Sequence, residues 1–462
     1  MSHQFHPSIL RAYDMRGIVD DTFSEQDCYW MGRGFATHAA EMFADAHPRI
    51  TVLRDGRNHS TRLARALIQG LKASGADVYN AGIGPTPMGY FATHRYDMHG
   101  AIIVTGSHNP PEHNGMKFML GQSSFYGDAL KALAARVESG ALLNGIGSEQ
   151  PLSLADDYAR ALLGASGADI IARPLRIAWD TGSGAAGEIV ELLSECLPLH
   201  AHGLLFTRLD GNFPHHHPDP SDASTLVQLQ QHVVHDRCDI GLAFDGDGDR
   251  IGIVDNLGRV VGPDHMLMLM SDDVLSYQPG ATIIADVKTS DAVFARIAAK
   301  GGVPLMWKTG HALIKHKMAE VGAAFAGEAS GHVFFADRYF GYDDALYAAL
   351  RLVAMLARTR TTLSAQIDAL PGLYSSPEIH IACADSEKFA RITALSDMLA
   401  LEGASVNTLD GARVSVDGGW WLLRASNTQA ALVGRIEADS ASSYDQIVAH
   451  MRTTLERCGL VL

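Results

Sequence analysis

The stretch AIIVTGSHNPPEHNGMK, residues 101–117, joins an apolar strand to a polar turn. Its apolar first half is typical of a buried strand, and the Gly, Asn and Pro residues indicate the turn that follows. Ser107 lies on this turn and Lys117 comes soon after it. The serine has no Gly-x-Ser-x-Gly motif around it, and spacing identifies no Asp and His partners, so a hydrolase is not indicated. Such a weak hydroxyl becomes useful if it carries a phosphoryl group whose charge a metal offsets.

The stretch DIGLAFDGDGDRIGIV, residues 239–254, is the candidate metal site. Asp245, Asp247 and Asp249 alternate with glycines between two short apolar runs, which predicts a tight loop between strands. Three carboxylates this close repel one another strongly unless a hard cation binds them. Ligands that are all oxygen suit magnesium or calcium, and the glycines let the backbone fold round the ion.

Two other kinds of site also use closely spaced aspartates. An EF-hand would need Gly at the sixth position and Glu at the twelfth, counted from Asp245, but the chain has Arg250 and Asn256 there, so this site is excluded. An aspartate-nucleophile phosphatase also has Asp-x-Asp after an apolar strand. In that alternative, which stays open, Asp245 is the nucleophile.

Both stretches belong to a weak internal repeat, in which strand-like runs alternate with stretches able to form helices, such as residues 61–75. Strand, helix, strand, helix, strand at this spacing predicts parallel sheets in three related α/β units. The first strands of the units are RITVLRDGR (49–57), LRIAWDTGSG (175–184) and ATIIADVKTSD (281–291), the second are ADVYNAGIGPTP (76–87), HGLLFTRLDGNFP (202–214) and GVPLMWKTGHALI (302–314), and the third are AIIVTGSHNP (101–110), IGLAFDGDGDR (240–250) and AAFAGEASGH (323–332).

Ligands of such sheets bind beyond the carboxyl ends of the strands. The repeat therefore places Ser107, the Asp245 loop and the Glu328 loop at equivalent edges of the three units, where they would enclose one cleft. From about residue 369 the pattern changes to short alternating strands with helices expected at 385–402 and 441–457. A linker is expected at PGLY, residues 371–374.

The loop RASNTQA, residues 424–430, lies between two of these later strands. Its Arg can hold a phosphate through two parallel hydrogen bonds, and the Ser, Asn and Thr can add further donors. The expected fold is α/β, with three similar mixed α/β domains and a smaller α+β C-terminal domain around a central active-site cleft. The domains are expected at 1–150, 151–255, 256–368 and 369–462, and they carry in turn the serine loop, the metal loop, the Glu328 loop and the phosphate-binding loop.

Length and composition favour an intracellular enzyme. The 462 residues, 47% of them hydrophobic, suffice for about three or four domains with substantial cores. A net charge of −15 argues against nucleic acid or an anionic membrane as a partner, so a phosphorylated ligand needs a local basic pocket. The N-terminus does not read as a signal peptide, and no apolar run of about 18 residues exists to span a bilayer. We therefore expect the cytoplasm, where the scattered cysteines stay reduced: Cys28, Cys196, Cys238, Cys383 and Cys458.

At this point the chain resembles a known family, the α-D-phosphohexomutases, and within it the bacterial phosphomannomutase/phosphoglucomutase group. The motifs that carry the resemblance occur in the family's order and cover almost the whole chain. They are RAYDMRG (11–17), TGSHNPPEHNGMK (105–117), DGNFPHHHPDP (210–220), DGDGDR (245–250), DVKTS (286–290), KTGH (308–311), GEASGH (327–332) and RASNT (424–428). The histidines at 215–217 belong to a motif that is not a ligand set in this family, so we expect a loop there.

The resemblance implies a role for each matching residue. Ser107 resembles the serine that carries the phosphoryl group, and an oxygen of its phosphate would join Asp245, Asp247 and Asp249 in binding Mg²⁺. The residues expected beside the transferring phosphoryl group are Lys117, Arg16 and Arg250, and His332 resembles the histidine that helps to move the hydroxyl proton. The remaining matches are Glu328 and Ser330 for the sugar ring, Arg424, Ser426, Asn427 and Thr428 for the non-reacting phosphate, and Tyr13, Asn109, Lys288 and His311 for further ligand contacts.

The activity implied is reversible phosphoryl transfer between C1 and C6 of glucose and mannose phosphates. A hexose 1,6-bisphosphate would form, turn end over end in the cleft and return its other phosphate to Ser107. Glucose 1,6-bisphosphate is the expected activator. We expect hexose phosphates as the partners, with no nucleic acid and no membrane, and a monomer as the working form.

The chain departs from the family's usual pattern at a few positions. Ala329 stands where Met is common, Lys308 replaces an Arg, and Gln429 and Ala430 replace Glu and Pro. None of these changes removes a residue assigned to chemistry. Asn427 favours the glucose/mannose group over the phosphoglucosamine mutases, which usually carry Gly there. A phosphoglucosamine mutase, the aspartate phosphatase and a non-catalytic phosphosugar-binding protein are the alternatives that remain.

Overall fold

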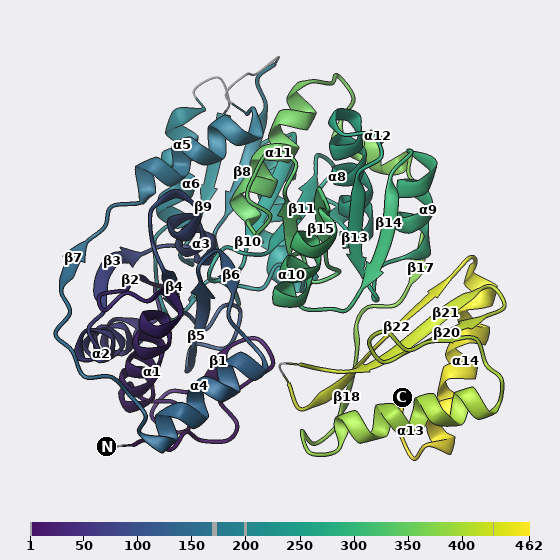
Figure 1. The fold of residues 1–462 in the computed structure, drawn as a ribbon. Coiled ribbons are helices and arrows are strands. Elements are labelled where there is room, and N and C mark those ends of the chain that lie inside the picture. Colours follow the sequence, from purple (N-terminus) through teal and green to yellow (C-terminus); the bar gives the residue numbers. More distant parts are fainter. Residues whose placement is uncertain (1, 169–172, 198–200, 428) are drawn as a thin grey trace.

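The computed structural model of the chain describes residues 2–168, 173–197, 201–427 and 429–462. Figure 1 shows three α/β units in contact and a fourth unit, formed by the C-terminal part of the chain, beside them. Each unit is built around its own sheet. The first sheet contains β1 (Met15–Ile18), β2 (Arg49–Arg54), β3 (Asp77–Ile83), β4 (Gly100–Val104), β5 (His113–Leu120), β6 (Ser123–Ser124) and β7 (Glu149–Pro151), and its helices are α1 (Glu25–Phe43), α2 (Ser60–Ala73), α3 (Thr86–Arg95) and α4 (Asp128–Ser139).

The second and third units repeat this arrangement. The second contains β8 (Arg176–Asp180), β9 (Ala201–Leu205), β10 (Ile240–Phe244), β11 (Ile251–Asp255) and β12 (Val260–Val261), with α5 (Ala155–Ser166), α6 (Gly187–Cys196), a 3₁₀ turn (Ala223–Leu226) and α7 (Val227–His235). The third contains β13 (Thr282–Asp286), β14 (Val303–Trp307), β15 (Phe325–Gly327) and β16 (Val333–Phe335), with α8 (Pro263–Tyr277), α9 (Asp291–Ala299), α10 (His311–Val321), α11 (Ala345–Ala357) and α12 (Leu363–Asp368).

The strand order confirms the internal repeat. The central strands run β3-β2-β4-β5 in the first sheet, β9-β8-β10-β11 in the second and β14-β13-β15-β16 in the third. Among these four central strands of each sheet, the first three in chain order are parallel, as expected, but the fourth is antiparallel to the third. The sheets are therefore mixed rather than purely parallel. The physical reason is the short loop between the third and fourth strands, because a short loop can join antiparallel strands but a parallel pair needs a long crossover.

We call these connections the return loops; they are residues 105–112, 245–250 and 328–332. They carry the serine, the three aspartates and the glutamate singled out in the sequence. The repeat thus places all three at the same edge of their sheets.

Helix α2 illustrates how the local sequence builds these units. Leu63, Leu67 and Leu71 recur every four residues, so they share one face of the helix. All three are buried, and the helix contacts β2 and β3. The helix begins at Ser60 and ends at Ala73, within two residues of the expected span of 61–75.

One hydrophobic cluster spans the first three units, and the first unit has a second cluster of its own. Leu53 and Tyr90 of the first unit, Trp179 of the second and Phe335 and Leu350 of the third belong to a single buried cluster. This continuity holds the three return loops in fixed relative positions, because close-packed interiors resist deformation.

The fourth unit has its own core, built around residues such as Trp421, Ile436 and Leu455. Its antiparallel sheet runs β17-β22-β21-β20-β19, and β18 also pairs with β22. Its elements are β17 (Tyr374–Ser375), β18 (Ile379–Ala382), β19 (Val406–Asn407), β20 (Ala412–Val416), β21 (Gly419–Ala425), β22 (Ala431–Ala438), α13 (Lys388–Leu401) and α14 (Ala441–Arg457). The α+β character expected for this part of the chain is confirmed. The domain boundaries after residues 150, 255 and 368 stay predictions.

Within the described residues, none of the helices is both long and apolar enough to cross a bilayer.

A buried carboxyl group joins the second and third units. Asp344 Oδ2 accepts hydrogen bonds from the hydroxyls of Tyr158 at 2.8 Å and Tyr339 at 3.0 Å, and Oδ1 accepts from the Tyr347 N–H at 2.9 Å. The last contact caps the start of α11. Burial raises the pKa of Asp344 to about 7, even though these hydrogen bonds favour the charged form.

The Asp344→Asn variant removes this titration and keeps a good helix cap. The pKa is raised in the folded state above the ordinary value of 3.8, so wild-type stability is full below about pH 4 and falls as the pH rises through about 7. Between these limits, the free energy of unfolding of the wild type should fall by up to about 4 kcal/mol relative to that of the variant. Urea unfolding at several pH values measures the difference. A difference that does not change with pH would show that Asp344 is ionised in the folded protein.

Candidate active site

The three return loops meet at one place. Ser107, on the first loop, donates from Oγ to Asp245 Oδ2, on the second, at 2.9 Å. Arg250 of the second loop forms an isolated β-bridge with His332 of the third. The structure therefore brings together the three sheet edges that the repeat predicted to face one another.

The three aspartates form a compact buried cluster. Asp245, Asp247 and Asp249 have no exposed surface, and one oxygen from each lies within 4.8 Å of the others. Asp245 Oδ1 accepts hydrogen bonds from the backbone N–H groups of Asp249 at 3.0 Å and Arg250 at 3.1 Å, which fixes the turn. Burial and the other two carboxylates raise the pKa of Asp245 well above its ordinary range. Burial acts on Asp249 in the same direction, but Lys117 lowers the pKa of Asp249 well below its ordinary range.

Lys117 and Thr86 hold one side of this cluster. Lys117 Nζ donates to Asp247 Oδ2 at 2.8 Å and to Asp249 Oδ2 at 2.5 Å. Thr86 Oγ1 also donates to Asp247 Oδ2, at 2.5 Å. Burial favours a neutral lysine, but the two carboxylates raise the pKa of the Lys117 ammonium well above its ordinary value. The lysine is therefore charged, and it occupies only the Oδ2 oxygens.

The Oδ1 oxygens of the cluster are the kind of ligand atom that a hard cation needs. Asp247 Oδ1 is buried and accepts no hydrogen bond from any described residue, and the buried Asp249 Oδ1 has His332 Nε2 beside it at 3.3 Å. Buried carboxylate oxygens without partners are costly, and an all-oxygen set is the one that magnesium prefers. Ser107 Oγ borders the same cluster through its contact with Asp245. The residues present therefore fit a magnesium ion.

Ser107 is held in an uncommon backbone conformation. Its φ of 50° lies in the left-handed region, which few residues other than Gly adopt. Its N–H donates to Thr105 Oγ1 at 2.8 Å, and its Oγ lies 3.1 Å from His108 Nδ1. Such a conformation persists only where the surroundings fix it, and it is concentrated at functional sites.

Two arginines add positive charge close to the serine loop. Arg16 donates from Nε to Asp14 Oδ2 at 2.7 Å and from Nη1 to Asn109 Oδ1 at 3.4 Å. Arg250 Nη1 lies 3.8 Å from Asp219 Oδ1. Together with Lys117 they form the local basic environment that a chain of net charge −15 needs in order to bind a phosphate.

The third return loop supplies a histidine between two carboxylates. His332 Nε2 lies 3.3 Å from Asp249 Oδ1, and its Nδ1 lies 3.2 Å from Glu328 Oε2 and 2.9 Å from Ser330 Oγ. Burial opposes the charge on this ring, but the two carboxylates raise the pKa of His332 to about 9. Glu328 Oε1 accepts from the Gly310 N–H at 2.5 Å. The loop is thus fixed from both sides.

Tyr13 links three of the four units. Its hydroxyl donates to the Thr309 carbonyl at 2.7 Å and accepts a hydrogen bond from Asn427 Nδ2 of the fourth unit. Its ring centre lies 5.7 Å from that of His311, which stacks on His332 at 5.6 Å. Residues that match widely separated motifs are therefore in contact.

The fourth unit presents an arginine with a free donor. Arg424 Nε donates to Asp410 Oδ2 at 2.9 Å, whereas its buried Nη2 has no hydrogen-bond partner among the described residues. Ser426 Oγ accepts from the Gln429 N–H at 3.1 Å, which shapes the turn of the loop. Thr428, also predicted to bind the phosphate, lies outside the described residues.

Two further predictions concern residues with partners of their own. Lys288 Nζ donates to Glu378 Oε1 of the fourth unit at 2.6 Å, so it is placed at the contact between the third and fourth units. The histidines at 215–217 lie in a loop, as expected. His216 Nε2 lies 3.1 Å from Asp180 Oδ1, which gives this ring a structural partner.

Sequence reasoning missed several charged and polar groups that support the site. Thr86 opens α3 and binds the metal loop, and its only signal was the GPTP turn. Asp343 pairs with Lys315 at 2.7 Å and lies 3.3 Å from His311 Nδ1. Arg57, in the RDGR turn after β2, contacts the serine loop. In each case the partner is distant in the sequence, so spacing carried no information about the contact.

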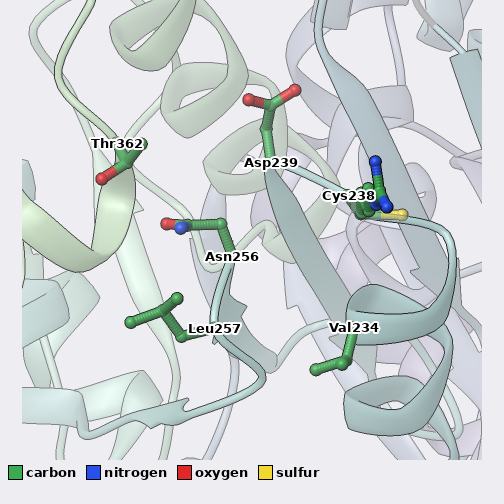
Figure 2. A pocket seen from close by; sticks show the side chains of 7 residues that line it. Val234, Cys238, Asp239, Asn256, Leu257 and Thr362 are labelled. Carbon is green, nitrogen blue, oxygen red and sulfur yellow. The ribbon is translucent and has the colours of Figure 1, made fainter.

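A separate hollow of about 360 Å³ lies between the second unit and Thr362 of the third (Figure 2). It adjoins the start of β10 and the end of β11, opposite to the ends that the metal loop connects. The hollow is therefore not part of the site formed by the return loops. Its lining residues are Val234, Arg237, Cys238, Asp239, Asn256, Leu257 and Thr362.

Four domain models of one protein family match the chain in order. They are the phosphoglucomutase/phosphomannomutase α/β/α domain I at residues 7–142, domain II at 156–258, domain III at 262–374 and the C-terminal domain at 378–454. Together they account for most of the 462 residues.

Individual relatives agree with these models. A phosphomannomutase/phosphoglucomutase of Pseudomonas aeruginosa is 42% identical over 450 residues, which cover 97% of this chain and 96% of the relative. A phosphoglucomutase of Neisseria gonorrhoeae is 40% identical over 452 residues, with coverage of 97% and 96%. The crystal structure of a phosphoglucomutase/phosphomannomutase family protein from Burkholderia thailandensis has a TM-score of 0.91 and 39% identity, and covers 99% of this chain and all of its own.

The Asp247→Asn variant tests the metal site directly. Removing one of three anionic ligands should weaken Mg²⁺ binding at least about tenfold, because this ion needs charged oxygen donors in fixed geometry. Isothermal titration calorimetry with MgCl₂ measures the affinity. Asp128→Asn, which changes a fully exposed carboxylate, is the matched control and should bind as the wild type does. Equal affinities for both variants would contradict this assignment.

Proposed function

The chain belongs to the phosphoglucomutase/phosphomannomutase family, and from this premise we propose that it is an isomerase that moves a phosphoryl group reversibly between C1 and C6 of glucose and mannose phosphates. The observation that carries the proposal is the contact of Ser107 Oγ with Asp245 at 2.9 Å, next to the carboxylates that Lys117 holds. On this proposal the nucleophile, the metal ligands and the charged Lys117 lie together.

Phosphorylated Ser107 donates its phosphoryl group to the free hydroxyl of a hexose monophosphate. The bond between phosphorus and Ser107 Oγ breaks, the bond to the sugar oxygen forms, and the hydroxyl proton finally resides on Ser107 Oγ. The product is a hexose 1,6-bisphosphate. After this intermediate turns end over end, the reverse transfer of its other phosphate restores phosphorylated Ser107, so one cycle moves the phosphate and regenerates the enzyme.

Phosphoryl transfer mainly requires that the negative charge on the transferring group be stabilised. Asp245, Asp247 and Asp249, with an oxygen of phosphorylated Ser107, would hold a magnesium ion, which supplies Lewis-acid stabilisation of the phosphoryl charge. Lys117 lies against the same carboxylates and is charged, so it can stabilise the charge that develops on the equatorial oxygens. Arg16 and Arg250 are proposed to act on the same group.

The sugar hydroxyl must lose its proton as it attacks. His332 is proposed to help to move this proton, because it projects from the third return loop toward the metal loop. Its pKa of about 9 keeps the ring charged at neutral pH, so it accepts the hydroxyl proton only as it passes one of its own to Asp249 or Glu328. Glu328 and Ser330 hold its other nitrogen, and on this proposal they also bind the sugar through O3 and O4. These hydroxyls occupy similar positions in the two orientations of the bisphosphate.

The non-reacting phosphate is assigned to the fourth unit. Arg424 has a donor without a partner among the described residues, and a phosphate oxygen would satisfy it. Ser426, Asn427 and Thr428 complete the proposed grip, and Tyr13 connects it with the first unit. Tyr13, Asn109, Lys288 and His311 are proposed as further ligand contacts.

Mg²⁺ is the proposed cofactor and glucose 1,6-bisphosphate the proposed activator, since a bisphosphate that leaves before its second transfer leaves Ser107 unphosphorylated. The proposed setting is the cytoplasm and the proposed form a monomer. The free thiols of Cys28 and Cys238, both buried, suit a reducing compartment.

Conversion of glucose 1-phosphate into glucose 6-phosphate tests the proposal. With Mg²⁺ present, the rate should rise when a trace of glucose 1,6-bisphosphate is added, because the bisphosphate phosphorylates Ser107. The Ser107→Ala variant should lose at least about a thousandfold in rate, since it cannot form the covalent intermediate. A coupled assay for glucose 6-phosphate measures both rates.

Other outcomes of this assay point to other activities. If Ser107→Ala released inorganic phosphate as fast as the wild type, Asp245 would be the nucleophile of a phosphatase. If a folded wild type left glucose and mannose phosphates unchanged but converted glucosamine phosphates, the chain would be a phosphoglucosamine mutase. If it bound hexose phosphates without turnover, it would be a binding protein. Each of these results would overturn the proposed function.

A second test concerns the choice between glucose and mannose. The two sugars differ at C2, and a grip through O3 and O4 ignores that position. We expect kcat/KM for glucose 1-phosphate and mannose 1-phosphate to differ by less than about a thousandfold, or roughly 4 kcal/mol of differential transition-state binding. A larger preference for either sugar, measured with the same enzyme preparation, would show a contact with O2.

A further inference from the structure

Arg57 is a buried arginine whose hydrogen bonds concentrate on the serine loop. Its Nη2 donates to the carbonyl oxygens of Ser107 at 2.7 Å and Asn109 at 2.5 Å, and its Nη1 donates to those of Pro110 at 2.5 Å and His113 at 3.0 Å. One guanidinium group thus binds three carbonyls of the serine loop and that of His113, the first residue of β5. A planar fork with five N–H groups is the one side chain that can do this.

The rest of the RDGR turn reinforces this contact. Asp55 Oδ2 lies 3.2 Å from Arg57 Nε and accepts from the Gly106 N–H at 3.0 Å. A side chain at Gly106 would have no room, because a Cβ there would lie 2.5 Å from the Arg57 guanidinium carbon. The arginine and the aspartate therefore hold the residue before Ser107 as well as the residues after it.

The second unit covers the guanidinium on its remaining side. The ring of Phe213 lies 5.1 Å from the guanidinium carbon, in cation–π geometry. Gly211 packs against the backbone of the same turn, where a Cβ would lie 2.8 Å from the Arg57 Cα. Arg57 has 2% of its surface exposed, so its hydrogen bonds are shielded from water and are stronger for it.

The loop that Arg57 binds needs such a constraint. Ser107 has a left-handed φ of 50°, which is unfavourable for a residue with a side chain. The four partners of Arg57 are backbone carbonyls, including that of Asn109, and not side chains proposed to bind substrate; they belong to the backbone that sets the position of Ser107 Oγ. A buried arginine with a packing role alone would not direct all four of these hydrogen bonds to one stretch of backbone.

We propose that Arg57 is a positioning residue, whose guanidinium fixes the serine loop so that Ser107 Oγ faces both the metal-binding carboxylates and the incoming sugar hydroxyl. This inference rests on the proposed function for its effect on turnover. Its structural part, the restraint of the loop, stands apart from any activity. Arg57 binds no substrate, so its loss should act on kcat rather than on KM.

The Arg57→Gln variant tests this role. A displacement of about 1 Å at a reacting atom costs about 100-fold in rate, so we expect kcat for glucose 1-phosphate to fall about 100-fold while KM stays within about threefold. The kcat of Arg57→Lys should lie between those of the wild type and Arg57→Gln, because an ammonium group has three donors and cannot reproduce the planar fork of the guanidinium. Hydrogen–deuterium exchange in residues 101–118 should be faster in both variants, and exchange in the metal loop, 239–254, should be unchanged.

Two controls separate positioning from general damage. Arg351→Gln also removes a buried arginine, one that pairs with Asp273 at 2.6 Å and Asp337 at 2.9 Å outside the serine loop. It should leave exchange in residues 101–118 and the KM unchanged. In Arg57→Ala, millimolar guanidinium should restore part of the lost kcat by occupying the vacated site, whereas Arg351→Ala should show no such rescue.

The result that supports the proposal is a lower kcat together with faster exchange in residues 101–118 and a normal affinity for Mg²⁺. Unchanged kcat in folded Arg57→Gln, or a lower kcat with unchanged exchange, would overturn it. If Arg57→Gln did not fold, Arg57→Lys would decide by the same two measurements. If the wild type had no mutase activity, the proposed function would fail, and the exchange comparison would still decide whether Arg57 restrains the loop.

Discussion

Three carboxylates buried on one short turn repel one another, and the arrangement of the cleft follows from the need to offset that repulsion. Lys117 neutralises part of the charge from one side, through the Oδ2 oxygens of Asp247 and Asp249. Asp247 Oδ1 remains without a hydrogen bond among the described residues and Asp249 Oδ1 lies 3.3 Å from His332 Nε2, so Lys117 leaves both Oδ1 oxygens to a cation. Ser107 approaches the same cluster through Asp245. The serine, the lysine and the metal ligands are therefore parts of one electrostatic unit, which an added phosphoryl group would join.

The fold brings these parts together by repetition. Each α/β unit ends its parallel strands with a short return loop, and the loops bear Ser107, the aspartates and Glu328 in turn. A common hydrophobic core fixes the three units against one another. The fourth unit has a separate core, and it contacts the others through polar pairs, such as Asn427 with Tyr13, and through a small apolar cluster of Val287, Trp420 and Leu422. This division suits a site that keeps its reacting groups rigid and still admits a ligand with a phosphate at each end.

The sequence predicted the parts of the site that local pattern controls. Ser107 and the three aspartates follow apolar strands on Gly-rich turns, so strand periodicity and turn chemistry located them. Strands on both sides of the metal loop were predicted, but the antiparallel direction of the fourth strand of each unit was missed, although the shortness of the return loops required it. Arg57 was missed because its partners lie about 50 residues away in a loop, and the Tyr13–Asn427 contact joins residues 414 positions apart. Contacts of this kind depend on how the units pack, which periodicity within a single strand or helix does not encode.

The site of covalent phosphorylation is the central claim, and peptide mapping tests it most directly. The purified protein is incubated with glucose 1,6-bisphosphate and Mg²⁺, digested and analysed by mass spectrometry. We expect one phosphate on Ser107, within residues 101–117, that withstands hydroxylamine as a phosphate ester does. A phosphate on Asp245 that hydroxylamine removes, or a protein that stays unmodified, would contradict it.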